Sequence, residues 1–263
     1  MFFQIQLDIK GHDYNKNFHE DLAIPIDLLT RLCKAEVPVL WRPFHEMTAA
    51  WMWWGAWQKN ENDSFTVNTE AYKKMWQYTY EYMTDTLGLD NLLWVYSPTP
   101  RDNICDTTSG VDIQGINDGG VRFCMPDDRY IDFVGLDSYF DSSYKTYSDV
   151  ISYDSMPNKD YGNAHQFERA YRSFMTLPSG MAVSLSECGY EVKWESDGKT
   201  DISQKSSDSL NSIINSMLDA QMGISYFMTW SGTSLQEMSD GGKCIMNNPR
   251  VLDLANSARM QGK

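Results

Sequence analysis

The sequence predicts an α/β fold of the (β/α)₈ TIM-barrel type, and three observations support this. Short runs of apolar, β-prone residues alternate with segments that repeat apolar residues at helical spacing, as in parallel sheets whose helices lie outside. Polar and aromatic residues follow directly after several of these runs, and active sites of such barrels lie at the carboxyl ends of their strands. The chain has 263 residues, close to the roughly 250 that one barrel needs.

Five buried strands are predicted, each a short apolar run bounded by polar or turn-forming residues. They are residues 37–42, 92–96, 131–136, 181–185 and 224–230. The segment Phe2–Leu7 contributes at most one further short strand. Because a complete barrel has eight strands, we expect an incomplete barrel of about five or six strands that lacks its early βα units.

Helices are expected between these strands, where apolar residues recur at helical spacing. Pro25 is compatible only with the first turn of the first helix, 19–36. Asn68 or Thr69 is placed to cap the second helix, which stops at Gly88. The predicted apolar stripes are Leu22, Ile26, Leu29, Leu32 and Cys33; Tyr72, Met75, Trp76, Met83 and Leu87; Phe167, Tyr171, Phe174 and Met175; and Leu210, Ile213, Ile214, Met217 and Leu218.

No repeat, low-complexity tract or linker divides the chain. The polar stretches 99–130 and 140–163 read as long surface loops of the same unit. We therefore expect residues 1–263 to form a single barrel domain that is truncated at its N-terminus.

Composition excludes several kinds of partner. A net charge of −14 argues against nucleic acid, whose phosphates require a basic surface. No apolar run is long enough to span a membrane, and no signal peptide is visible in the chain. The five cysteines show no CxxC spacing, so neither a metal site nor a redox motif is predicted. Cys105 and Cys124 lie in one loop-like region, and the sequence leaves open whether they form a disulfide.

The most informative stretch is 37–55, VPVLWRPFHEMTAAWMWWG. A buried strand leads into Glu46, and a cluster of tryptophans follows within a few residues. A carboxylic acid at a strand end can protonate a leaving oxygen, and flat tryptophan faces can stack on sugar rings. This combination of residues predicts a sugar-cleaving site.

Two other interpretations of the stretch are less well supported. Position 49 is Ala49, so the histidine spacing of an HExxH zinc site is absent. A group of tryptophans is often simply part of a core. The density of Trp51, Trp53, Trp54 and Trp57 directly after a strand-end carboxylate favours the catalytic interpretation.

The stretch also resembles the acid/base motif of glycoside hydrolase family 26, chiefly β-mannanases, which runs close to RPFHE(M/H)(N/T)GxWFWWG. Ala50 and Met52 are the two departures from that pattern. A second segment, 185–189 (LSECG), resembles the family's nucleophile motif (L/T)xE(x)G. The resemblance extends from about residue 14 to Trp230.

The resemblance implies roles for the charged residues. Glu46 would be the general acid/base, and Glu187 the nucleophile of a retaining glycosidase. Arg42 would orient the catalytic carboxylates through its charge. His45 would hold the nucleophile or the bound sugar by hydrogen bonds.

The remaining site residues also follow from the resemblance. Trp51 would form part of the aromatic wall, and Trp230 would stack under the sugar bound at subsite −1. Segment 135–139 is similar to the family's GxDxY strand end, with Asp137 binding substrate and Tyr139 donating a hydrogen bond to the nucleophile. Ser231 and Gly232 replace the Arg-Asn that often follows the tryptophan in the family.

The sequence therefore predicts a retaining endo-β-1,4-mannanase that needs no cofactor or metal. Its partner would be a mannan-type polysaccharide, and the resemblance implies a secreted or cell-surface location. The same mechanism on β-1,3-xylan or mixed-linkage β-glucan remains an alternative. A non-catalytic carbohydrate-binding relative is a further alternative, disfavoured because Glu46 and Glu187 are both present.

Overall fold

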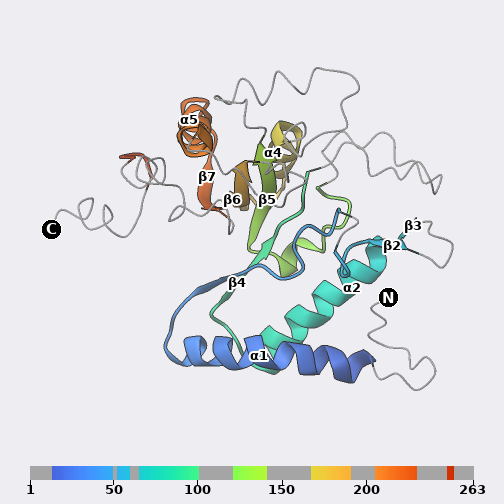
Figure 1. The fold of residues 1–263 in the computed structure, drawn as a ribbon. Helices are drawn as coiled ribbons and strands as arrows, with labels where there is room; N and C mark the ends of the chain where they lie inside the picture. The colour runs from blue at the N-terminus through green and yellow to red at the C-terminus, as the bar shows by residue number, and fades with distance from the viewer. Residues whose placement is uncertain are drawn as a thin grey trace, which may run out of the picture. The chain divides into compact units, whose positions relative to one another are not determined.

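The computed structural model of the chain describes residues 14–49, 52–59, 65–100, 121–140, 167–190, 205–229 and 248–251. Within these ranges, most strands of the main sheet are separated by helices, as the sequence predicts (Figure 1). No helix in the described ranges is both long and apolar enough to cross a membrane.

Among the described residues, five strands form one sheet, in the order β1-β4-β5-β6-β7. Their bounds are β1 (Val39–Trp41), β4 (Leu92–Tyr96), β5 (Phe133–Phe140), β6 (Ala182–Tyr190) and β7 (Ile224–Thr229). Strand β4 pairs in parallel with β1 and with β5. Each strand coincides with a predicted one, so the α/β class and the five predicted strands are confirmed. The segment Phe2–Leu7 lies outside the described residues.

The chain divides into two compact units. Unit 1 comprises Met1–Asp137 and Arg169–Val183, and unit 2 comprises Ser138–Glu168 and Ser184–Lys263. Two of the three divisions fall inside strands β5 and β6, which belong to one sheet, and the third falls inside helix α4 (Phe167–Met175). That the whole chain is one domain therefore stays a prediction.

In unit 1, helix α1 (Tyr14–Lys34) lies across the C-terminal part of helix α2 (Thr69–Tyr80) (Figure 1). The His19 Nε2 atom is 2.7 Å from the Tyr78 hydroxyl, and its ring lies edge-on to Tyr82 with centroids 4.5 Å apart. The expectation that Pro25 occupies a first turn is wrong, because α1 begins earlier and Pro25 lies in its interior. Proline removes the N–H that would bond to the Asp21 carbonyl. Asp21 is exposed, so water can serve that carbonyl instead.

Helix α2 builds the core of unit 1. Asn68 caps it, its side chain accepting the Ala71 N–H at 3.0 Å. The predicted inward stripe is buried at Tyr72, Met75, Trp76 and Met83. Leu87 does not belong to it, being 40 % exposed after the π-helical turn η1 (Glu81–Thr86). That turn shifts the helical phase, because it adds a residue per turn.

The core of unit 1 is largely aromatic. Trp76 packs edge-on against Trp94 of β4, with ring centroids 5.8 Å apart, and against Tyr96 at 6.0 Å. Cys124 is buried in this unit as a free thiol, so the disulfide left open by the sequence is not formed. Burial raises the pKa of that thiol well above its ordinary value.

Helix α4 (Phe167–Met175) buries Phe167, Tyr171 and Phe174 as predicted, whereas Met175 is 56 % exposed. In unit 2, helix α5 (Lys205–Asp219) buries Ile213, Ile214 and Met217 of its predicted stripe. Asn248 is 6 % exposed, and its amide donates to the side-chain oxygens of Asn211 and Asn215, at 3.0 Å each.

A hairpin that the sequence did not predict follows the tryptophan cluster. Strands β2 (Trp57–Lys59) and β3 (Phe65–Val67) pair antiparallel. The chain then passes into α2, and the Asn68 N–H donates to the Ala56 carbonyl at 2.8 Å. The hairpin thus fixes the end of the segment that begins at Glu46.

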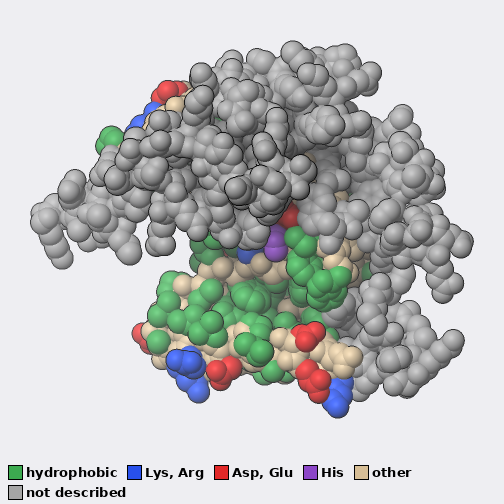
Figure 2. Space-filling view, in the orientation of Figure 1, with side chains coloured by type: hydrophobic (Ala, Val, Ile, Leu, Met, Phe, Trp, Pro, Cys, Tyr) green, Lys and Arg blue, Asp and Glu red, His purple; other side chains and the backbone are tan. Residues whose placement is uncertain are grey.

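Strand β1 stands at one end of the sheet, so β4 is its only neighbour among the described residues. Leu40 of β1 is 44 % exposed, and Ile24 and Leu28 on α1 are 82 % and 53 % exposed. Figure 2 shows hydrophobic side chains over α1, flanked by charged ones. In the described part of the chain β1 is therefore an edge strand that is only partly covered, an arrangement that favours association between strands.

Candidate active site

The chain turns sharply after β1, where Glu46 is placed. Phe44 and Glu46 adopt left-handed backbone conformations, with φ of 51° and 54°. Side chains with a Cβ avoid this region, at a cost of about 1–2 kcal/mol per residue. Such conformations persist only where surrounding contacts enforce them. Glu46 itself is 7 % exposed.

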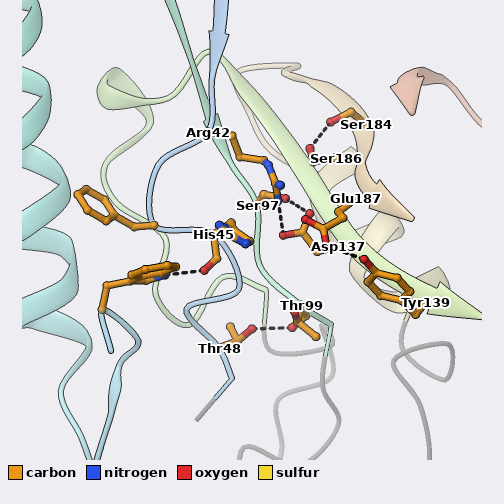
Figure 3. A network of polar contacts seen from close by, with 12 residues as sticks. Arg42, His45, Thr48, Ser97, Thr99, Asp137, Tyr139, Ser184, Ser186 and Glu187 are labelled. Atoms are coloured by element: carbon orange, nitrogen blue, oxygen red, sulfur yellow. Dashed lines mark hydrogen bonds and ion pairs between the residues drawn. The ribbon is translucent and has the colours of Figure 1, made fainter. Parts of the chain in front are cut away.

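Hydrogen bonds enforce the turn on both sides of Glu46. The Glu46 N–H donates to the Ser97 carbonyl after β4, and the Ala49 N–H donates to the Glu46 carbonyl, both at 2.9 Å. The Thr48 hydroxyl donates to the Thr99 carbonyl at 2.6 Å (Figure 3). The end of β4 therefore anchors the segment that carries the predicted acid.

Gly55 closes this segment and leaves no space for a side chain. A Cβ there would lie 2.9 Å from the Ala49 carbonyl oxygen, 3.0 Å from that of Met52 and 3.3 Å from that of Met47. These are backbone atoms, which cannot move aside singly.

We expect Gly55→Ala to destabilise the protein by about 1–3 kcal/mol, as overpacking does, and to displace the segment 47–49. Thermal unfolding measures the first effect, and an NMR amide spectrum of residues 46–56 the second. An unchanged midpoint together with an unchanged spectrum would contradict the tight packing at Gly55.

Arg42 and Asp137 form a largely buried ion pair in unit 1. The Arg42 guanidinium donates to Asp137 Oδ2 at 2.7 Å, with the two side chains 15 % and 0 % exposed. The Ser97 hydroxyl donates to the other oxygen, Oδ1, at 2.6 Å (Figure 3). The ends of β1, β4 and β5 are thus tied together by one carboxylate. Sequence reasoning assigned Arg42 to the catalytic carboxylates and did not find this pair.

In unit 2, the Tyr139 hydroxyl donates to Glu187 Oε1 at 2.6 Å (Figure 3). Glu187 is 6 % exposed and lies within β6, which extends further than predicted, as β5 does at Tyr139. On β6 the hydroxyls of Ser184 and Ser186 are 2.8 Å apart, and Ser186 is 3.2 Å from the Tyr226 hydroxyl. The contact predicted between Tyr139 and the nucleophile is present; the catalytic roles stay predictions.

The tryptophans divide into those the structure describes and those it does not. Trp51 and Trp230 lie outside the described residues, so their predicted sugar contacts stay predictions. Trp53 is 56 % exposed and packs edge-on against Trp54, with centroids 5.3 Å apart. The Trp54 indole N–H donates to the His45 carbonyl at 2.7 Å. No group of three or more metal-binding side chains occurs within the described ranges.

A sheet whose strands alternate with helices is typical of α/β barrel proteins. The structure of the Bacillus subtilis mannanase BCman is similar to this protein, with a TM-score of 0.57 and 24 % sequence identity. The match covers 90 % of this chain and 55 % of the BCman chain. The structure of a β-mannanase from a symbiotic protist of the termite Reticulitermes speratus is also similar, with a TM-score of 0.57 and 22 % sequence identity. That match covers 94 % of this chain and 57 % of the protist enzyme's chain. These likenesses confirm the fold class.

The family model "Glycosyl hydrolase family 26" matches residues 3–210. A curated mannan endo-1,4-β-mannosidase of Bacillus subtilis is 39 % identical over 86 % of this chain and 48 % of its own length. The chain belongs to glycoside hydrolase family 26, as the motifs around Glu46 and Glu187 indicate. It spans about half the length of that relative.

Proposed function

We propose that this protein hydrolyses β-1,4-mannan within the chain and with retention of configuration, using Glu187 as nucleophile and Glu46 as general acid/base. The observation that carries this is the buried Glu187 carboxylate, with the Tyr139 hydroxyl 2.6 Å from Oε1. A nucleophile gains most when its attacking atom is held in one direction. The Tyr139 hydrogen bond provides that restraint.

The chemistry proceeds in two displacements. In the first, Glu187 attacks the anomeric carbon while Glu46 protonates the departing glycosidic oxygen, which leaves a glycosyl ester on Glu187. In the second, Glu46 takes a proton from water, and the resulting nucleophile releases the sugar from Glu187. No metal or cofactor enters either step.

This mechanism predicts a distance. A retaining glycosidase needs the carboxyl groups of Glu46 and Glu187 about 5–5.5 Å apart, whereas an inverting one needs roughly 6.5–9.5 Å. A crystal structure of the protein with a mannooligosaccharide measures that distance directly. A separation above about 10 Å would remove this pair from the mechanism.

The proposed substrate rests on the relatives, several of which are named as mannan endo-1,4-β-mannosidases. The test is reducing-end release from mannan, glucomannan, β-1,3-xylan and lichenan, with Glu187→Ala as the blank. We expect mannan and glucomannan to be cleaved. Release from xylan or lichenan alone would keep the mechanism and change the sugar.

Binding to mannan without any release of reducing ends would favour the non-catalytic alternative.

Because a polysaccharide is too large to enter a cell intact, we also propose that the protein acts outside the cell or on its surface. Protease treatment of intact cells, followed by detection of the protein, tests that location.

A further inference from the structure

Four consecutive carbonyl groups around Glu46 each accept a hydrogen bond from a different donor. The donors come from four separate places: two are side chains, and two are backbone N–H groups. The pairs are Phe44 with the Tyr72 hydroxyl at 3.1 Å, His45 with the Trp54 indole at 2.7 Å, Glu46 with the Ala49 N–H at 2.9 Å, and Met47 with the Ala56 N–H at 3.0 Å.

The two side-chain donors hold the carbonyls just before Glu46. A carbonyl's direction is fixed by the dihedral angles on either side of it, so restraining the carbonyls of residues 44 and 45 restrains the peptides that lead into Glu46. Phe44 and Glu46 both have positive φ, which the backbone does not prefer. Without these donors, relaxation toward an ordinary conformation would turn the Glu46 side chain away from its present direction.

Tyr72 is suited to this task. Its ring is 2 % exposed in the core of unit 1, on the well-capped helix α2, so the hydroxyl has a fixed position. Burial is the main cause that raises the pKa of Tyr72 well above its ordinary value. The hydroxyl therefore keeps its proton, and acts as a donor, at neutral pH.

Trp54 acts from the other side of the turn. Its indole N–H reaches the His45 carbonyl, and its ring lies 5.7 Å from the His45 ring and 6.5 Å from the Phe44 ring, measured between centroids. An indole nitrogen can only donate a hydrogen bond, so Trp54 is the donor and the His45 carbonyl is the acceptor. Trp54 therefore helps to hold the turn.

We propose that Tyr72 and Trp54 are positioning residues for Glu46: they hold the strained turn before it, and so set the direction in which its carboxyl meets the substrate. This rests on the proposed role of Glu46 as general acid/base. Neither side chain touches the reacting atoms, so their removal should impair protonation of the leaving group and leave nucleophilic attack intact.

The main variant is Tyr72→Phe, which removes one hydroxyl and keeps the buried ring. We expect kcat/KM for mannan to fall about 10–100-fold, as a small misplacement of a reacting group does. With a 2,4-dinitrophenyl β-mannoside, whose leaving group departs without a proton, kcat/KM should fall less than about threefold. Trp54→Phe should show the same contrast.

The matched control is Tyr96→Phe. Tyr96 is equally buried in unit 1, and its hydroxyl donates to the Val121 carbonyl at 2.8 Å, away from the turn. The Tyr96→Phe substitution should change kcat/KM for both substrates by the same small factor. For Trp54→Phe the control is Trp94→Phe, because the Trp94 indole donates to the Thr84 hydroxyl at 3.2 Å.

Amide hydrogen exchange gives a readout that needs no activity. The Glu46 N–H is bonded to the Ser97 carbonyl after β4, and the Ala49 N–H is bonded to the Glu46 carbonyl within the turn. Both should exchange faster in Tyr72→Phe and at an unchanged rate in Tyr96→Phe. Unchanged exchange in Tyr72→Phe, or an equal loss of activity on both substrates, overturns the inference. If exchange rises but the wild-type protein cleaves no glycan, the turn's support is upheld and the proposed function fails.

Discussion

Glu187→Ala is expected to abolish mannan hydrolysis, with kcat falling by more than about 10⁴-fold, because the covalent intermediate can no longer form. Added azide should restore part of the activity. It would occupy the space of the missing carboxylate and attack the anomeric carbon directly, while Glu46 still protonates the leaving group. A single displacement inverts the configuration, so the product should be the α-glycosyl azide.

Glu46→Ala provides the complementary result. Loss of a general acid/base typically costs about 10²–10⁴-fold in rate. Here Glu187 still forms the intermediate, and azide attacks it without needing a base, so the product should be the β-glycosyl azide. Nuclear magnetic resonance of the anomeric proton distinguishes the two products.

Glu20→Ala is the control for both variants. Glu20 is an exposed carboxylate on α1, 3.6 Å from Lys16, and its removal should leave the rate unchanged. If the two azide products appear in exchanged order, the roles of Glu46 and Glu187 are exchanged as well.

Arg42→Met should cause the largest loss of stability among the single substitutions considered. It removes the guanidinium from Asp137, which is 0 % exposed. Breaking a buried ion pair by removing one partner costs about 3–5 kcal/mol, because a charge remains in a medium of low dielectric constant. We expect about 3 kcal/mol, since the Ser97 hydroxyl still donates to Asp137. Urea unfolding at several pH values measures the loss.

The pH dependence of that loss has a definite sign. Without its cation, Asp137 favours the neutral form, so its pKa in the folded variant rises above the unfolded value of about 3.9. The destabilisation is therefore greatest at neutral pH and shrinks as the pH falls through that raised pKa.

Arg250→Met is the matched control for this substitution. Arg250 contacts Asp219 at 2.6 Å, but the side chains are 40 % and 71 % exposed, so the loss should stay below about 1 kcal/mol. Equal losses in the two variants, or a loss in Arg42→Met that does not change with pH, would contradict the importance of burial.

The sequence predicts the parts of the fold that depend on local pattern. The clearest strand, Leu92–Tyr96, is a continuous and largely buried apolar run, as expected of a strand that is covered on both faces of a parallel sheet. The sequence predicts Asn68 or Thr69 as the cap, and the structure shows Asn68, whose side chain acts on its own helix. The hairpin β2–β3 was missed because its strands are short and their pairing depends on contacts between them rather than on pattern.

The candidate site is predictable only in part, for the same reason. Glu46, Glu187 and Tyr139 were found from motifs at strand ends, and the Tyr139–Glu187 contact is present. The Arg42–Asp137 pair joins residues far apart in the chain. The place of Trp54 in the tryptophan cluster predicted stacking on a sugar ring. Its hydrogen bond to the His45 carbonyl depends on the folded turn and is not visible in the sequence.

The left-handed backbone of Glu46 places activity and stability in conflict at one residue. With φ of 54°, this position suits glycine better than any residue with a Cβ, by about 1 kcal/mol. A library selected only for resistance to heat would therefore enrich Glu46→Gly, and its most stable members would lack the proposed general acid/base. Directed evolution of this protein consequently needs selection on turnover in every round.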